Sequence, residues 1–219
     1  IMQRIGIYGG TFNPPHIGHI RAAEYAVQAL ELDLLLLIPS GTSPHKPLPA
    51  GSPSAFQRLE MVRLWAGEKM QACDLEIARG GTSYTYETVE QIHLQYPQAE
   101  LILFMGTDMF LSFQSWRHPE KILKNASLAV FYRGEKEEIE KIGEVTEELR
   151  QAGHTVYPVE NPVTEISSTQ LREKLGSGGG KEFLHPAVYG YILREKLYGT
   201  HCDLTALTLS ELRCVALSM

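Results

Sequence analysis

The sequence contains little cysteine and no long apolar run. Only three of its 219 residues are cysteine, and none of them form a CxxC pair. An odd and sparse count argues against a disulfide scaffold or a zinc knuckle and favours a reducing compartment. No stretch approaches the roughly 18 apolar residues of a membrane-spanning helix, and the first residues do not resemble a signal sequence. We therefore expect a cytoplasmic protein without a membrane partner.

The sequence also lacks an excess of positive charge. It has 20 Lys and Arg residues against 26 Asp and Glu residues, which gives a formal net charge of -6. Proteins that wrap nucleic acid are normally basic, so we do not expect a nucleic-acid partner. Binding of small anionic ligands is not excluded, because one pocket can be positive on an acidic protein. The 43% hydrophobic and 21% charged residues are typical of a globular domain.

The chain alternates between short apolar runs and amphipathic segments. Strands are predicted where β-branched or continuous apolar residues cluster, and helices where apolar residues recur every three or four positions. The predicted strands are 3–8, 33–38, 100–105, 127–132 and 154–159; the predicted helices are about 17–30, 54–70, 85–96, 119–124, 135–150, 168–175 and 186–196. This order predicts a Rossmann-like α/β fold, a doubly wound parallel sheet with helices on both faces and a small C-terminal helical portion.

The predicted helix 54–70 carries large apolar side chains that we expect on one buried face. They are Phe56, Leu59, Met61, Val62 and Trp65.

The stretch YGGTFNPPHIGH, residues 8–19, follows the first predicted strand. In doubly wound sheets, ligands bind beyond the carboxyl ends of strands. Gly9 and Gly10 let a ligand approach the main chain, and the helix that begins near His16 offers unpaired N–H groups. His16 and His19 share its first turn, where two imidazole donors suit a phosphate. The spacing predicts an anion pocket, with phosphate as the preferred ligand.

Two other interpretations of this histidine pair stay open. A metal site would require further ligands, and no Cys, Asp or Glu lies nearby in the sequence. The histidines could also be ordinary capping and surface residues. A Walker P-loop is excluded because the stretch contains no GxxxxGK[ST].

Five segments, in order, resemble one known family. GGTFNPPHIGH is similar to the signature of the HIGH-motif nucleotidyltransferases, and ISSTQLR at 166–172 is similar to their second element. SPHK at 43–46, TSYTYETV at 82–89 and GTDMFLSFQSW at 106–116 narrow the resemblance to the bacterial nicotinate mononucleotide adenylyltransferases. The resemblance covers residues 2–198, which we expect to form the nucleotidyltransferase domain. It implies that ATP and nicotinate mononucleotide are joined into deamido-NAD, with release of pyrophosphate, in NAD biosynthesis.

The resemblance also assigns roles to individual residues. The catalytic contacts to the phosphates are His16, His19, Lys46 and Arg172. The ATP-binding residues are Gly9, Gly10, Thr11, Phe12, Gly18, Gly106, Asp108, Ser167, Ser168 and Thr169. The residues that bind nicotinate mononucleotide are Tyr84, Thr85, Trp116 and Arg133. Mg²⁺ is implied as the ion carried by the ATP phosphates, held mainly by phosphate oxygens and water without a protein metal cluster.

Several of these residues also have a structural interpretation. Asp108 is expected to bind the ribose hydroxyls of ATP and could equally cap a helix. Trp116 is expected to stack on the nicotinate ring, although core packing would also account for it. The backbone around Thr85 is expected to receive the nicotinate carboxylate, because an N–H group suits a carboxylate better than a carboxamide. We therefore expect the acid substrate to be preferred over the amide.

Three other functions stay open. Pantetheine-phosphate adenylyltransferases share an opening of this kind, but the Trp116 segment favours the nicotinate enzymes. An aminoacyl-tRNA synthetase is disfavoured by the small size, the acidity and the lack of a KMSKS-like segment. A non-catalytic ATP sensor is disfavoured by the full set of predicted phosphate contacts. The sequence does not determine the oligomeric state, and a homo-oligomer is possible.

Residues 199–219 lie beyond the resemblance. Leu212, Val215, Ala216 and Met219 fall on one face of a predicted helix. This extension either docks on the domain or begins a further domain, since some bacterial relatives carry an HD-type phosphohydrolase domain after the transferase.

Overall fold

A computed structural model describes residues 2–42, 47–161, 166–201 and 205–219. Its centre is a single sheet of six parallel strands in the order β3-β2-β1-β4-β5-β6. The strands are β1 (Arg4–Gly10), β2 (Leu34–Pro39), β3 (Met70–Ala72), β4 (Glu100–Gly106), β5 (Ser127–Tyr132) and β6 (Val156–Glu160). The predicted parallel, doubly wound sheet is confirmed.

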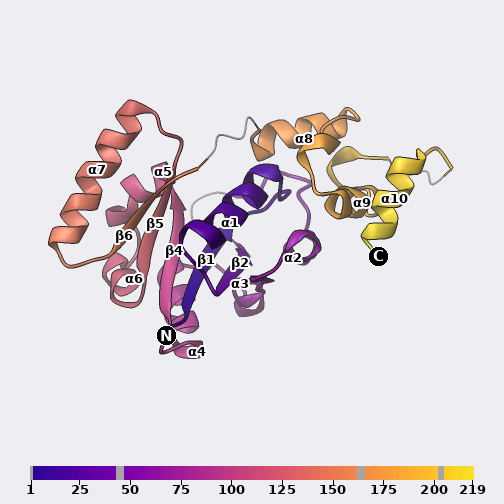
Figure 1. Cartoon of the computed structure of the whole chain (residues 1–219). Helices are drawn as coiled ribbons and strands as arrows, with labels where there is room; N and C mark the ends of the chain where they lie inside the picture. The colour runs from indigo at the N-terminus through magenta and orange to yellow at the C-terminus, as the bar shows by residue number, and fades with distance from the viewer. Residues whose placement is uncertain (1, 43–46, 162–165, 202–204) are drawn as a thin grey trace.

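Helices cover both faces of the sheet, as predicted (Figure 1). One face packs against α1 (Ile17–Ala29), α2 (Ala55–Trp65), α8 (Ser168–Gly176) and α9 (Pro186–Arg194). The other packs against α3 (Leu75–Arg79), α4 (Thr85–Gln95), α6 (Pro119–Asn125) and α7 (Lys136–Gln151). The short α5 (Thr107–Leu111) follows β4 directly, and α10 (Leu209–Leu217) is the last helix.

The buried strands supply both cores because their side chains alternate between the two faces. In β2, Leu35 and Leu37 enter one core, whereas Leu36 and Ile38 enter the other. In β1, Gly6 allows the neighbouring side chains to approach closely. A Cβ atom there would lie 2.7 Å from Leu35 Cδ1, so a larger residue would require repacking.

The predicted helix 54–70 is too long, and one of its expected core residues is wrong. The helix α2 ends at Trp65, and Met70–Ala72 form the edge strand β3 instead. This strand has only three residues, too few to show an alternating pattern. Phe56 is 67% exposed, whereas Arg58 on the same helix is 0% exposed. Arg58 donates hydrogen bonds to main-chain carbonyl oxygens, which explains why a charged residue takes this core position.

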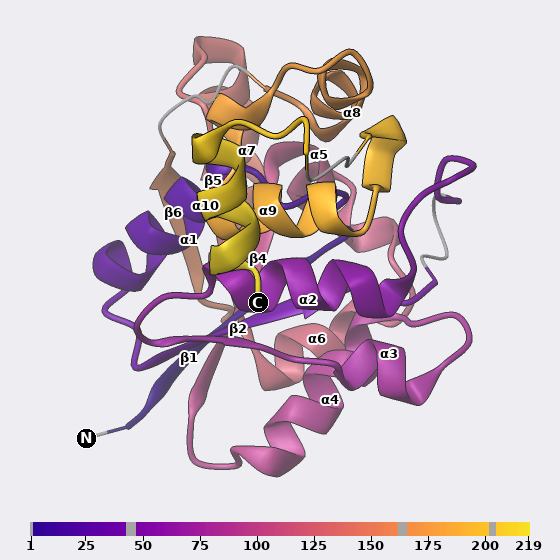
Figure 2. The same cartoon turned by 90° about the vertical axis from the view of Figure 1, so that its right-hand side faces the viewer.

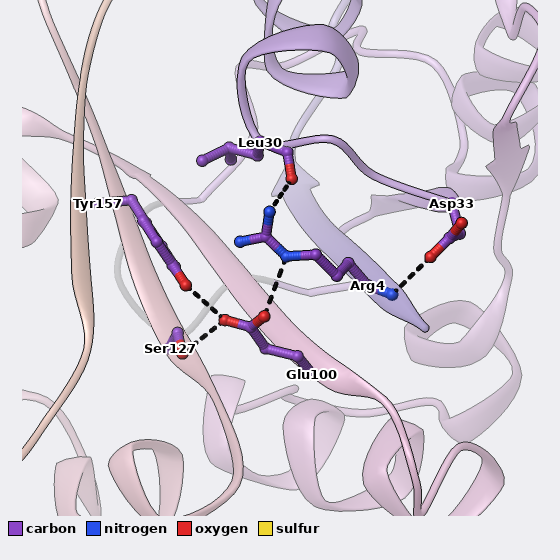
Figure 3. Close-up of polar contacts among 6 residues, drawn as sticks. All are labelled: Arg4, Leu30, Asp33, Glu100, Ser127 and Tyr157. Carbon is purple, nitrogen blue, oxygen red and sulfur yellow. Dashed lines mark hydrogen bonds and ion pairs between the residues drawn. The ribbon is translucent and has the colours of Figure 1, made fainter. Parts of the chain in front are cut away.

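A polar cluster ties together the amino ends of the strands (Figure 3). Arg4 Nε donates to Glu100 Oε2 at 3.0 Å, and the Tyr157 hydroxyl donates to Glu100 Oε1 at 2.7 Å. Ser127 Oγ also donates to Glu100 Oε1, and Arg4 Nη1 donates to the carbonyl of Leu30. The cluster therefore joins β1, β4, β5 and β6 at the end of the sheet opposite to the predicted site.

We expect Glu100→Gln to lower the free energy of unfolding by about 1–3 kcal/mol, because Arg4 loses its charged partner while half-buried. The turnover number should stay within about twofold of the wild type, since the cluster lies at the other end of the sheet. Urea unfolding and initial-rate kinetics measure the two quantities, with the exposed Glu24→Gln as the control. An unchanged unfolding midpoint would show that the cluster does not stabilise the sheet.

The C-terminal helix α10 packs on α9 (Figure 2). The helices approach so closely at Gly190 that a Cβ atom there would lie 1.8 Å from the carbonyl oxygen of Cys214. The Tyr189 hydroxyl donates to Glu211 Oε1 at 3.3 Å, and Arg194 Nη1 donates to the Ser218 carbonyl at 2.9 Å. The extension thus docks on the domain. The domain boundary after residue 198, and the hypothesis that the extension begins an HD-type domain, stay predictions.

In the described part of the chain, no helix combines the length and apolar character that crossing a membrane requires.

Candidate active site

Two adjoining cavities lie at the carboxyl ends of the central strands. The chain runs outward from β1 to β3 and returns at β4, so β1 and β4 form the switch point at which ligands bind in such sheets. The first cavity has a volume of about 600 Å³ and the second of about 720 Å³. Both are lined by Gly9, Phe104, Asp108 and Met109. Ligands in the two cavities would therefore meet next to β1 and β4.

The first turn of α1 carries the predicted histidine pair, and both residues line the first cavity. His16 is the N-cap of the helix, and its Nδ1 accepts a hydrogen bond from the backbone N–H of Gly18 at 3.1 Å. The His19 Nδ1 accepts from the backbone N–H of His16 at 3.1 Å. Both histidines thus take part in the cap of α1, but they are not ordinary surface residues, since His16 is 8% exposed and both line the cavity. The cap does not exclude a ligand contact, because only one nitrogen of each ring is used.

The hydrogen bonds of these rings determine which nitrogen can face a ligand. Because each Nδ1 accepts, the neutral rings carry their proton on Nε2, which is left as a donor. Burial lowers the pKa of His16 to about 4. Burial and the neighbouring His16 lower the pKa of His19 well below its ordinary value. Both residues are therefore neutral hydrogen-bond donors near pH 7.

The glycines of the opening stretch lie where the sequence predicts them. Gly9 lines both cavities, while Gly10 and Thr11 line the second. Gly18 lines the first cavity, as does Gly106 at the end of β4.

Phe12 lines neither cavity, and the expected contact of its backbone with ATP stays a prediction. It has a φ of 48° and is 1% exposed, and its ring packs against Trp65 and His19. Its side chain therefore supports the histidine helix from within the core.

Asn13 connects three distant segments behind the histidines. Its carbonyl accepts from Arg172 Nη1 at 2.8 Å, and its Oδ1 accepts from the Tyr198 hydroxyl at 2.8 Å. Its Nδ2 donates to Ser52 Oγ at 2.9 Å. Asn13 itself is 2% exposed. Arg172 thus braces the loop before α1, and its predicted contact with a phosphate stays a prediction.

The hydroxyl groups of the second motif serve the start of α8. Ser167 is the N-cap, and its Oγ accepts from the backbone N–H of Gln170 at 3.2 Å. Thr169 Oγ1 accepts from Arg172 Nη2 at 3.1 Å. Ser167, Ser168, Thr169 and Arg172 line neither cavity, so their contact with the triphosphate stays a prediction.

Asp108 lies in the first turn of α5 and lines both cavities. The N-cap of this helix is Gly106, so the expected capping role of Asp108 is wrong. The exposed carboxylate is free of that role and lies between the two ligand spaces, which fits the predicted contact to ribose hydroxyls.

The second cavity contains the residues expected to hold the pyridine nucleotide. Thr85 is the first residue of α4 and Tyr84 is its N-cap, and both residues line the cavity. The Tyr84 N–H donates to Glu87 Oε2 at 3.3 Å, whereas the first residues of a helix have N–H groups without an intrahelical partner. Trp116 lines the same cavity, with its ring centroid 5.6 Å from that of Phe113. An aromatic plane and a helix N-terminus are thus presented to one ligand.

Arg133 lies apart from this group. It lines the first cavity together with His16 and His19. Its position favours a contact with the ligand of that cavity over the expected contact with nicotinate mononucleotide. Lys46, with the rest of the SPHK segment, lies outside the described residues.

Sequence reasoning missed two charged residues of the second cavity. The guanidinium carbon of Arg117 lies 4.6 Å from the centroid of the Tyr84 ring. Glu76 of α3 accepts a hydrogen bond from Thr88 Oγ1 at 2.9 Å, and burial raises its pKa. The position of Arg117 directly after Trp116 was a usable signal. Glu76 belongs to a short helix that the sequence pattern does not predict.

Comparisons with known proteins agree with this geometry. A model of the cytidylyltransferase-like family matches residues 7–174. Two relatives, each named "probable nicotinate-nucleotide adenylyltransferase", come from Citrifermentans bemidjiense and Geotalea daltonii. They are 35% and 34% identical to this chain, and each alignment covers 90% of this chain and 98% of the relative.

A solved structure of Plasmodium falciparum nicotinic acid mononucleotide adenylyltransferase, complexed with NaAD, has the same fold. Its TM-score is 0.70 at 19% identity, over 92% of this chain and 100% of that chain. The chain therefore belongs to the cytidylyltransferase-like family and, within it, to the nicotinate-nucleotide adenylyltransferases.

Proposed function

We infer that this chain transfers the adenylyl group of ATP to the phosphate of nicotinate mononucleotide, giving deamido-NAD and pyrophosphate. The observation that carries the inference is the pair of adjoining cavities that meet at Gly9 and Asp108. One cavity offers phosphate donors and the other an aromatic plane with a helix N-terminus. Two nucleotides bound in this way would bring their phosphates together, and the names of the relatives support the same reaction.

The reaction itself requires alignment more than acid–base chemistry. A phosphate oxygen of nicotinate mononucleotide attacks the α-phosphorus of ATP, and the bond to the bridging oxygen of the β-phosphate breaks as pyrophosphate leaves. The nucleophile is already an anion, so no base has to remove a proton. The Nε2–H groups of His16 and His19 and the N-terminus of α1 would stabilise the charge that builds on the phosphates.

The second cavity accounts for binding of a pyridine nucleotide with an acidic ring substituent. Trp116 would stack on the nicotinate ring, and the N–H groups at Thr85 would receive its carboxylate. Arg117 adds a positive charge to the same cavity. The Glu76 carboxylate, also in this cavity, would repel an anion placed next to it, so we place the nicotinate carboxylate toward α4 and Arg117.

Magnesium would accompany the triphosphate. Within the described ranges, no three His, Cys, Asp or Glu side chains are grouped so that they could hold a metal ion. Asp108, Glu135 and Glu138 line the first cavity without forming such a group, and this lining suits an ion held mainly by phosphate oxygens and water, as Mg²⁺ often is. When bound, it would neutralise phosphate charge.

We expect Arg117→Gln to raise the KM for nicotinate mononucleotide about three- to tenfold with little change in kcat, because an exposed cation contributes to ground-state binding. The matched control is Lys121→Gln. Lys121 also lies over a tyrosine ring, with its Nζ 4.9 Å from the Tyr86 centroid, but it lines neither cavity. Initial rates at varied mononucleotide measure both variants. Equal KM values for Arg117→Gln and the wild type would remove Arg117 from the substrate site.

The function is tested by identifying the product. The protein is incubated with ATP, Mg²⁺ and nicotinate mononucleotide, and in parallel with ATP, Mg²⁺ and 4′-phosphopantetheine. Deamido-NAD detected by mass spectrometry in the first mixture alone is the expected result. Product from phosphopantetheine alone would favour the pantetheine-phosphate enzymes, and calorimetric binding of ATP without any product would favour the sensor.

A further inference from the structure

The helix α2 buries a charged residue in an otherwise apolar face. Arg58 is 0% exposed and lies beside Leu59 and Val62, which are equally buried. Burying a cation is unfavourable unless its donors are satisfied, because the charge loses its hydration. Figure 2 shows α2 between β2 and α9, and the helix contacts both of these elements.

The Arg58 guanidinium holds the two loops that leave β1 and β2. Its Nη1 donates to the carbonyl of Thr11 at 2.8 Å. Its Nη2 donates to the carbonyl of Ser40 at 2.7 Å and to that of Gly41 at 3.3 Å. Thr11 and Ser40 both line the second cavity. One side chain therefore links two loops that form the wall of this cavity, alongside the backbone hydrogen bond from Ser40 N–H to the Gly10 carbonyl at 2.9 Å.

The charge of Arg58 has no negative partner in the protein as described. In residues 2–42, 47–161, 166–201 and 205–219, no carboxylate forms an ion pair with it. All three of its acceptors are neutral carbonyl oxygens. Desolvation lowers its pKa, as expected for a buried cation. The phosphates of the two substrates would meet where the cavities adjoin, at Gly9, two residues before Thr11. The triphosphate of ATP, reaching this point from the first cavity, would supply the missing negative charge.

We propose that Arg58 is a positioning residue that aligns the loops after β1 and β2 and supplies a buried positive charge that the substrate phosphates balance. The proposal rests on the proposed function for the identity of the anions. It makes a prediction that a purely structural role does not make. Loss of Arg58 should weaken binding in proportion to the phosphate charge of the ligand, whereas a structural role would weaken all ligands alike.

The test compares Arg58→Met, Arg58→Lys and the control Arg63→Met. Arg63 lies on the same helix, but it is exposed and forms an ion pair with Glu60. Dissociation constants for adenosine, AMP and ATP with Mg²⁺ are measured by calorimetry for each protein. For Arg58→Met, we expect adenosine to bind within about twofold of the wild type and ATP to bind at least about tenfold more weakly. Arg58→Lys should be intermediate, because it keeps the charge and loses the fork of donors. Arg63→Met should resemble the wild type.

Equal weakening of adenosine and ATP, or no weakening of either, would overturn the proposal. Thermal unfolding without ligand accompanies each titration. If Arg58→Met does not fold, Arg58→Lys and the wild type still test whether the loss grows from adenosine to ATP. The binding measurements require no turnover. A charge-dependent loss in a protein that forms no deamido-NAD would leave the proposal standing and reject the proposed function.

Discussion

The variant His19→Gln is expected to fold as the wild type does and to lose about 100- to 1,000-fold in kcat. Glutamine is the N3 residue of the capping boxes of α2 and α8, where Gln57 and Gln170 accept from the N-cap backbone. It should therefore replace the capping bond that His19 makes to His16. Its amide NH2 is bonded to the same carbon as the capping oxygen, so it cannot take the position of the imidazole Nε2–H. Misplacement of one donor to a transition-state oxyanion has an effect of this size. Steady-state kinetics and urea unfolding measure the two expectations.

The complementary variant is His16→Ser, because serine is the N-cap of α2 and α8. It should lower kcat with a similarly small effect on stability. The control is Ser54→Ala, which removes a cap from α2 and should lower the free energy of unfolding by about 1 kcal/mol without lowering kcat. A His19→Gln enzyme with wild-type kcat would show that the histidine pair only caps α1.

Acid is expected to destabilise the protein through the same two histidines. His16 titrates near its ordinary pKa of about 6.5 when unfolded and at about 4 when folded. Below pH 6.5 the unfolded chain therefore binds a proton that the folded protein does not. The stability is fully present above pH 6.5 and falls by about 1.4 kcal/mol per pH unit toward pH 4, or about 2 kcal/mol at pH 5. His19, whose pKa is lowered in the same direction, adds to this loss.

The measurement is the free energy of unfolding in urea at pH 7.5 and pH 5.0, for the wild type and the double variant His16→Ser, His19→Gln. Carboxylates that titrate in this range contribute to both proteins and cancel in the comparison. The double variant should lose at least about 2 kcal/mol less than the wild type between the two pH values. Equal losses would mean that these histidines are not buried as neutral groups.

The sequence predicts the fold well because the buried strands are short, apolar and regularly spaced by amphipathic helices. It fails where an element is too short for a pattern, as in β3 and α3. It also fails at α2, where apolar periodicity selects Phe56 for the core. Arg58 occupies that face because three carbonyl oxygens from distant loops surround it.

The site is predictable to the extent that its residues lie in compact motifs. Sequence reasoning finds His16, His19 and Thr85 because each lies at a predicted helix start. The first N–H groups of any helix have no intrahelical partner, so such a start can be expected to bind an anion. The bracing of Asn13 by Arg172 and Tyr198 joins residues 159 and 185 positions apart, and no local pattern contains it. The position of Arg133 after β5 does not reveal which of the two adjoining cavities it lines.

Release of pyrophosphate from ATP and Mg²⁺ with either nicotinate or nicotinamide mononucleotide is the measurement that tests the central claim most directly. The claim is that the second cavity holds an acidic pyridine nucleotide against the ATP in the first. We expect release with the acid at least about tenfold faster than with the amide, a difference of about 1.4 kcal/mol in the barrier. Equal rates would contradict the placement of the nicotinate carboxylate at Thr85 and Arg117, and no release with either substrate would contradict the reaction itself.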